Sequence, residues 1–306
     1  MLVMGSLQEP VQAKGTAVII ATRGRPDIVR GLVGQLAEQS KPPEHIFVIA
    51  SKADDISGLD RNQDNLTIQV GRTGSALQRN DGLALAGSRF SHIVFFDDDF
   101  VPSRYWIERM TELFESRPDI AGLTGTVLAD GTTTAGIGPN EAQAIMRRRD
   151  SDPSHGGALH ESVGYGGNTG CNMAFRYSAI RSITFDERLP LYGWLEDADF
   201  RGQVARHGRV VRADILWGVH LGHKQGRGRG VRLGYSQIAN AVYLAKKGTV
   251  PTAYLANLAT KNFLSNTLRS LRPEPFVDRR GRLIGNIIAL ADLVRGRIAP
   301  ERVLAL

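Results

Sequence analysis

The sequence predicts an α/β fold, in which a mostly parallel sheet carries helices on both faces. Short apolar runs of strand length alternate with amphipathic stretches of helix length over residues 16–128. This alternation is the pattern of strand–helix–strand units, which build parallel sheets. The chain has 306 residues, 42% of them apolar, and is therefore long enough to bury a large core.

Residues 16–96 supply the first half of this sheet. Strands are expected over 16–21, 46–50, 66–70 and 93–96, because each range is a short apolar run. Pro26 suits the first turn of a helix that Pro42 and Pro43 end, and Ser75 can cap a second helix that runs to about Ala86. The inward faces of these helices are predicted to be Ile28, Val29, Leu32, Val33 and Leu36, and Leu77, Ala84 and Leu85.

The later elements are less regular. A third helix is expected from Ser103, and a strand is expected over 120–128. Residues 130–170 are rich in Gly, Thr, Ser and Asp with few apolar clusters, which is typical of a functional loop or a disordered segment. Another helix starts at the acids of residues 196–199 and ends before His207. The buried side of the third helix is predicted to be Trp106, Met110, Leu113 and Phe114.

Three consecutive acids, Asp97, Asp98 and Asp99, follow the strand at 93–96. They repel one another unless a cation neutralises them, and carboxylates suit magnesium or manganese, which also bind phosphates. In open α/β sheets, ligands bind beyond the carboxyl ends of the strands. The position therefore predicts a metal-assisted phosphate or diphosphate site. The alternative is a solvated acidic turn before the next helix.

A second acidic cluster contains Glu196, Asp197 and Asp199. Acids at the start of a helix are stabilised by the helix dipole, which is a purely structural explanation. The functional explanation is a general base that faces a cleft and removes a proton from a substrate hydroxyl.

Composition limits the function classes. The single Cys171 excludes an internal disulfide and a cysteine zinc cluster, and fits a reducing cytosol. No apolar run is long enough to span a membrane, and the N-terminus lacks the pattern of a signal peptide. Residues 201–306 contain 19 Lys and Arg against 5 Asp and Glu, whereas residues 1–200 contain 19 against 26. A basic last third predicts an anionic partner there.

The order of the motifs resembles family 2 glycosyltransferases, which have the GT-A fold, a Rossmann-like sheet that binds nucleotide sugars. The resemblance covers residues 16–245. The matching segments are Thr22-Arg23-Gly24-Arg25-Pro26, Arg79-Asn80-x-Gly82, Asp97-Asp98-Asp99, Gly170-Cys171-Asn172, Phe185-Asp186-Glu187 and Glu196-Asp197-Ala198-Asp199.

The resemblance implies inverting transfer of a sugar from a nucleoside diphosphate sugar, with a UDP-sugar as first choice, to a saccharide or polyprenyl-linked saccharide. It implies that Asp99 binds manganese or magnesium, with His220 or His223 completing the site. It assigns the general base to Asp197, or alternatively Glu196, and acceptor binding to Gly170, Asn172 and Trp194. Donor binding is assigned to Thr22, Arg23, Arg25, Asp54, Arg79, Asp97, Asp98, Lys224 and Arg227.

Two departures from the family pattern concern the donor base. Gly24 stands where the first motif usually has Asn, and the acids after the second strand come late, at Asp54 and Asp55. Asp54 is the candidate to replace the missing base contact. The basic segment from Lys224 to Arg232 is either a clamp that closes over the diphosphate or a solvated loop.

The predicted organisation is a flexible N-terminus (1–14), a GT-A catalytic domain (15–249) and a basic helical tail (250–306). The catalytic domain divides into a nucleotide-binding half (15–100) and an acceptor-binding half (101–249). Apolar helical faces with basic flanks in the tail fit an anionic membrane surface, or packing on the domain or on a second subunit. The protein is expected to be cytoplasmic, and peripheral on the inner face of the membrane if the tail binds lipid.

Two other functions are alternatives to sugar transfer. A nucleotidyltransferase that makes nucleotide sugars would carry a Gly-rich phosphate loop near the N-terminus, and residues 22–26 have one Gly. A non-catalytic protein that binds an anionic polymer would use the basic tail, but no nucleic-acid-binding motif or aromatic stacking pattern supports it. Nucleic acid is therefore not an expected partner.

Overall fold

The computed structural model describes residues 14–151, 157–161, 170–224 and 230–306. In these ranges, one mixed sheet has the strand order β3–β2–β1–β4–β8–β6–β9–β5, and β7 pairs with β9. Six strands run the same way, and β8, β5 and β7 run against their neighbours. The strands are β1 (Thr16–Thr22), β2 (His45–Ala50), β3 (Leu66–Val70), β4 (His92–Asp97), β5 (Phe100–Pro102), β6 (Ile120–Asp130), β7 (Leu159–Glu161), β8 (Asn172–Arg176) and β9 (Arg209–His220).

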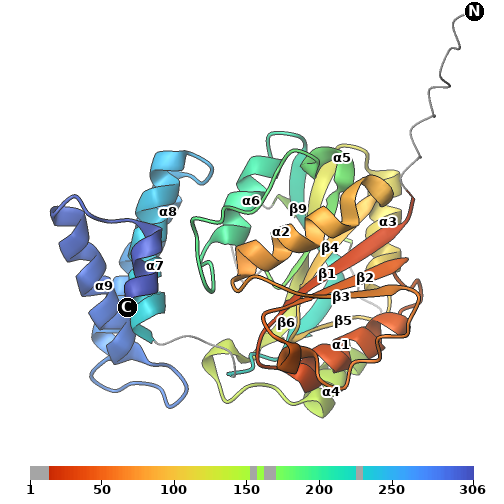
Figure 1. The fold of residues 1–306 in the computed structure, drawn as a ribbon, viewed down its shortest axis with the longest axis horizontal. Coiled ribbons are helices and arrows are strands. Elements are labelled where there is room, and N and C mark those ends of the chain that lie inside the picture. The colour runs from red at the N-terminus through yellow and green to blue at the C-terminus, as the bar shows by residue number, and fades with distance from the viewer. Residues whose placement is uncertain (1–13, 152–156, 162–169, 225–229) are drawn as a thin grey trace, which may run out of the picture.

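Helices cover both faces of the sheet (Figure 1). They are α1 (Pro26–Ala37), α2 (Ser75–Ala86), α3 (Trp106–Ser116), α4 (Pro139–Asp150), α5 (Tyr177–Ile180), α6 (Glu196–Val204), α7 (Gly230–Lys247), α8 (Thr252–Arg269) and α9 (Arg279–Val294). Short 3-10 segments occupy Ala53–Ile56, Gly87–Arg89, Gly131–Thr133 and Pro300–Ala305.

Two apolar cores lie on opposite faces of the sheet, because successive strand residues point to opposite faces. Val18 and Ile20 of β1 pack with α1 and α3 on one face. Ala17 and Ile19 pack with α2, α5 and α6 on the other. The predicted α/β fold with helices on both faces is thus confirmed.

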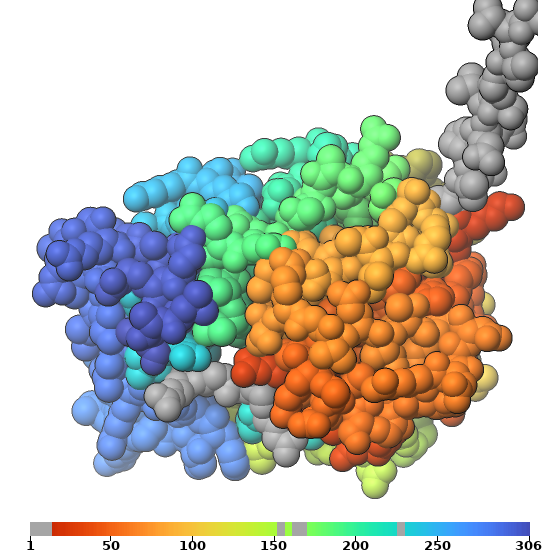
Figure 2. Space-filling view, viewed as in Figure 1, coloured from red at the N-terminus to blue at the C-terminus, as the bar shows by residue number. Residues whose placement is uncertain are grey.

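The three C-terminal helices form a bundle beside the sheet (Figures 1 and 2). α7 packs closely on α9, since a Cβ added to Gly234 would lie 2.0 Å from the carbonyl oxygen of Arg282. α7 and α8 also contact the segment before α6, through a core that includes Leu195, Leu244 and Leu255. The predicted boundary at residue 249 falls between α7 and α8.

Four local predictions were wrong. Ala84 of α2 is exposed, and the helix buries Gln78 and Arg79 as well as the apolar Ala76 and Ala86, because part of its inward face binds polar partners. Ser75 is the first residue of α2 rather than its cap, and the third helix begins at Trp106 rather than at Ser103. Residues 139–150 form α4, which was missed because only Ala142 and Met146 of that helix are buried.

Candidate active site

The predicted site residues gather at the edge where the parallel strands end. β1 ends at Thr22, β4 at Asp97 and β9 at His220. The starts of α2 and α6 meet at the same edge, where the Ser75 hydroxyl donates to Glu196 Oε1 at 3.0 Å. A cavity of about 260 Å³ opens there and is lined by residues of both acidic clusters. Ligands bind at this edge in open α/β sheets, so the cavity is the candidate active site.

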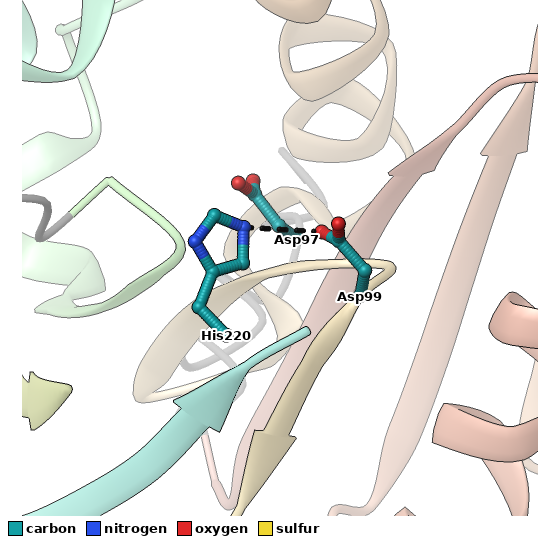
Figure 3. Close-up of side chains that lie close together, drawn as sticks. All are labelled: Asp97, Asp99 and His220. Atoms are coloured by element: carbon teal, nitrogen blue, oxygen red, sulfur yellow. Dashed lines mark ion pairs between the residues drawn. The ribbon is translucent and has the colours of Figure 1, made fainter. Parts of the chain in front are cut away.

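Asp97, Asp99 and His220 can each offer one atom to a metal ion, and these atoms lie within 4.8 Å of one another. Figure 3 shows the imidazole of His220 beside both carboxylates, with its ion pair to Asp99. The distance from His220 Nε2 to Asp99 Oδ1 is 3.2 Å. Two carboxylates and an imidazole suit a divalent ion such as Mn²⁺. The cluster therefore fits a divalent metal.

Both ring nitrogens of His220 face a carboxylate. Nδ1 lies 3.2 Å from Asp130 Oδ1, on the side of the ring opposite Asp99. Burial lowers the pKa of His220, but hydrogen bonds to Asp130 and Asp99 outweigh it and raise the pKa to about 10. Against the opposing effect of burial, His220 lowers the pKa of both carboxyl groups. Asp130 thus orients the ring, as carboxylates behind ligating histidines commonly do.

Arg25, from the turn after β1, forms ion pairs with two acids of the triplet, Asp98 and Asp99. Its Nη1 lies 2.9 Å from Asp99 Oδ2, and its Nη2 lies 2.8 Å from Asp98 Oδ1. Asp98 also accepts a hydrogen bond from the Thr22 hydroxyl at 2.6 Å. Burial raises the pKa of Asp98, and Arg25 opposes that rise. Arg25 therefore supplies part of the positive charge that the sequence argument assigned to a metal ion.

Arg79 of α2 joins the two acidic clusters. Its buried guanidinium pairs with Glu196 and, at 2.7 Å, with Asp97 Oδ1. It also donates to the carbonyl oxygen of Gly170 at 3.3 Å. Desolvation of this arginine is costly, but three acceptors compensate it. Arg79 thus connects the end of β4 to the start of α6.

Glu196 and Asp197 have different environments. Glu196 is buried, and burial raises its pKa to about 7 although Arg79 lowers it. The Asp197 side chain is 22% exposed and pairs with Arg201 one turn later, at 2.9 Å. A Cβ added to Gly170 would lie 2.9 Å from Asp197 Oδ2, so the glycine leaves room beside this carboxylate. Both acids line the cavity, and Asp197 has the more exposed side chain of the two.

The model of the family described as "Glycosyl transferase family 2" matches residues 17–184, more than half of the chain. The chain belongs to glycosyl transferase family 2. This confirms the resemblance drawn from the motifs, and with it the assignment as a glycosyltransferase. No curated protein matches the chain.

Solved structures of glycosyltransferases share the fold. TarS 1-349 from S. aureus in complex with UDP-GlcNAc aligns with a TM-score of 0.59 and 16% identity, over 95% of this chain and 83% of that one. The mannosyltransferase PcManGT from Pyrobaculum calidifontis, in complex with GDP-Man and Mn²⁺, aligns with a TM-score of 0.54 and 17% identity, over 98% and 82%. At these identities the likeness establishes the GT-A fold.

The other residues predicted to bind the donor are scattered over this glycosyltransferase. Arg23 is exposed. The side chain of Asp54 is 84% exposed and pairs with Lys52 at 3.2 Å. Lys224 Nζ donates to the carbonyl oxygens of Gly131 and Thr132, at 2.9 and 2.8 Å. Arg227 lies outside the described residues. The donor roles of these four residues stay predictions.

The residues predicted to bind the acceptor also differ in position, and so does His223. Gly170 and Trp194 line the cavity. Asn172 is fully buried, and its Oδ1 accepts from the backbone N–H of Gly125 on β6. His223 contributes its backbone N–H to Asp99 Oδ2 at 2.9 Å. The Asn172 side chain thus joins β8 to β6, and His223 contacts Asp99 through its backbone N–H.

Sequence reasoning missed Asp55, Asp130 and Tyr254. Asp55 is fully buried, and its Oδ1 accepts from the N–H of Gly24 at 2.8 Å, which fixes the turn before Arg25. Asp130 ends β6, so the rule that drew attention to the end of β4 also applies to it. Tyr254 lines the cavity from α8, and no motif pointed to it.

Proposed function

We propose that the chain transfers a sugar, with inversion, from a nucleoside diphosphate sugar to a saccharide or a lipid-linked saccharide. The observation that carries the proposal is that Asp197 shares one cavity with Asp97 and His220 of the candidate metal cluster. In an inverting transfer, the general base and the diphosphate site must lie on opposite sides of the sugar carbon that reacts. UDP-sugars are our first choice of donor, since TarS was solved with UDP-GlcNAc.

The residues of the chain have separate tasks in this reaction. Asp197 accepts the proton of the acceptor hydroxyl. As it does so, the oxygen of that hydroxyl bonds to the anomeric carbon, and the bond from this carbon to the diphosphate breaks. Arg79 holds Glu196 and Asp97 in place by its two ion pairs. Asp97, Asp99 and His220 would hold a divalent ion, which neutralises charge on a diphosphate when bound.

A panel of nucleotide sugars tests the proposal. UDP-, GDP- and dTDP-sugars are incubated with the protein and Mn²⁺ or Mg²⁺, and release of the nucleoside diphosphate is measured with and without excess chelator. We expect one donor to be consumed, and only with the metal present. Consumption of none, with nucleotide sugars instead formed from a sugar phosphate and a nucleoside triphosphate, would favour the rival nucleotidyltransferase.

Metal affinity is expected to rise with pH. The His220 pKa of about 10 means that the ring is protonated at neutral pH, and it must lose that proton to ligate an ion through Nε2. The dissociation constant for Mn²⁺ should therefore fall between pH 6.5 and 8.5, by up to about tenfold per unit. Calorimetry at several pH values measures it, and His220→Gln should flatten the dependence. A pH-independent wild type would exclude His220 as a ligand.

We also propose that the C-terminal helices dock on an anionic membrane. Large apolar side chains are exposed along α8 and just beyond it (Leu264 52%, Leu268 70%, Leu271 80%) and along α9 (Ile284 52%, Ile287 53%, Val294 89%). Arg272, Arg280, Arg295 and Arg297 are exposed around them. In the described part of the chain, no helix combines the length and hydropathy that a bilayer span requires. Apolar side chains with basic neighbours fit an interfacial site on anionic lipid.

One arginine of the basic tail, Arg279, is buried and does not face the solvent. Arg279 is 9% exposed and pairs with Glu274 at 2.9 Å. It also donates to Asn266 Oδ1 at 3.1 Å. Its role is therefore to hold the segment between α8 and α9.

Replacing Arg280, Arg295 and Arg297 by Gln is expected to weaken binding to anionic liposomes at low salt by up to about 100-fold. Each basic residue near such a surface contributes about 1 kcal/mol, and salt screens this attraction. Liposome co-sedimentation measures the effect. The control replaces the exposed Arg61, Arg104 and Arg148, which alters net charge equally on the α/β part. Equal losses in both variants, or no wild-type binding, would contradict membrane docking.

A further inference from the structure

The C-terminal bundle contributes directly to the wall of the catalytic cavity. Tyr254 and Leu258, one turn apart on α8, line it together with Asp197 and Arg201. Burial raises the pKa of the Tyr254 phenol, and the charges of Arg201 and Asp197 act on it in opposite directions. The phenol of α8 therefore lies within electrostatic reach of the proposed base.

The same wall continues through the segment before α6. The rings of Tyr192 and Trp194 are stacked, with centroids 6.5 Å apart and planes inclined by 26°. Both residues line the cavity, and Tyr192 is 62% exposed. The Trp194 indole Nε1 is buried and has no hydrogen-bond acceptor among the residues that the structure describes. The wall thus offers a broad aromatic surface to the cavity.

This segment has a strained backbone that the surrounding elements hold in place. Leu191 and Leu195 have φ values of +62° and +72°, which non-glycine residues rarely adopt. The Asn240 side chain of α7 donates to the carbonyl oxygen of Trp194 at 2.7 Å. The backbone N–H of Ser75 donates to the carbonyl oxygen of Leu191 at 2.9 Å. Such strain persists where packing enforces it, and it concentrates at functional sites.

We infer that Tyr192, Trp194 and Tyr254 form a saccharide subsite in which the acceptor ring lies against the aromatic wall beside Asp197. The inference rests on the proposed function and specifies its acceptor side. The apolar C–H face of a pyranose matches aromatic rings, while its hydroxyls need polar partners, such as Asp197 and Arg201 in the lining of the same cavity. The bundle that carries Tyr254 is thereby part of the active site and positions the acceptor.

Intrinsic fluorescence tests the subsite without knowledge of the donor. The chain has three tryptophans, and Trp106 and Trp217 are fully buried, so Trp194 is the one that a ligand in the cavity can reach. Methyl glycosides and disaccharides of glucose, N-acetylglucosamine, mannose and galactose are titrated with and without UDP and Mn²⁺. We expect a saturable change in emission with at least one saccharide, and its loss in Trp194→Phe.

Variants of α8 then separate stacking from fold stability. Tyr254→Ala should weaken that saccharide about tenfold, whereas Tyr254→Phe, which keeps the ring, should stay near the wild type. Phe263→Ala on the same helix, outside the cavity wall, controls for damage to the bundle. In transfer assays the acceptor KM should rise about tenfold in Tyr254→Ala and stay near the wild-type value in Phe263→Ala.

Two results would overturn the inference: no saccharide alters the emission, or Tyr254→Ala and Phe263→Ala have equal effects. Both can occur while a nucleotide sugar is still hydrolysed in a metal-dependent way, so they refute the subsite without refuting glycosyl transfer. Conversely, saccharide binding with no donor consumed would refute the proposed function alone.

Discussion

Asp99→Ala is expected to lower transfer by about 10³-fold or more, because it removes a proposed ligand of the divalent ion. An ion that neutralises the departing diphosphate contributes several kcal/mol to the transition state, and each 1.4 kcal/mol corresponds to tenfold in rate. The change also deprives Arg25, His220 and the His223 N–H of a shared acceptor. The measurement is turnover of the active donor together with Mn²⁺ affinity by calorimetry.

Asp54→Ala is the matched control, since Asp54 is another carboxylate near the donor edge but its side chain is 84% exposed. It should leave Mn²⁺ affinity unchanged. Thermal melting shows whether Asp99→Ala has remained folded. Wild-type turnover in excess chelator, or in the Asp99 variant, would show that the reaction does not depend on an ion at this cluster.

Asp197→Asn is expected to lower turnover by about 10²-fold or more with nearly unchanged donor binding. Asparagine keeps the size and polarity of the side chain but cannot accept a proton at neutral pH, and loss of a general base has an effect of this size. Donor affinity should persist because Asp97, Asp99 and His220 are untouched. Turnover and nucleotide titrations separate the two effects.

Glu196→Gln provides the comparison, because Glu196 also lines the cavity but is buried and pairs with Arg79. If Asp197→Asn kept near-normal turnover while Glu196→Gln lost it, the base would be Glu196. If neither variant lost turnover, no acid of this cluster would be the base.

Much of the fold could be predicted because apolar patterns report burial. One face of α1 and the strands up to β4 carry apolar residues. Val29, Leu32, Val48 and Val94 are examples, and each is buried as the apolar pattern predicts. α2 defeats this reasoning, because its inward face includes Gln78 and Arg79, whose partners lie on β1, β2, β4 and α6. α4 defeats it too, since a helix with two buried residues has almost no apolar pattern.

The candidate site could be predicted in part, because motifs name residues but not their contacts. Asp99 and His220 were assigned to one ion from two separate segments, and the structure brings them together with Asp97, which had been assigned to the donor. Asp55 was passed over for its neighbour Asp54, because adjacent acids in a turn are indistinguishable until the backbone decides which is buried. Tyr254 required the packing of α8 on the cavity, which a local pattern cannot specify.

The hydrogen-bond partners of the site are far apart along the chain, and this affects how the protein folds. Thr22 bonds to Asp98 across 76 residues, Ser75 to Glu196 across 121 and Asp99 to His223 across 124. Contacts of such long range form late and slow the search for the native state. The segment that matches the family, 17–184, holds neither Asp197 nor His220. A fragment limited to residues 17–184 therefore lacks part of the cavity wall, and a ligand that binds the cavity stabilises the folded chain by mass action.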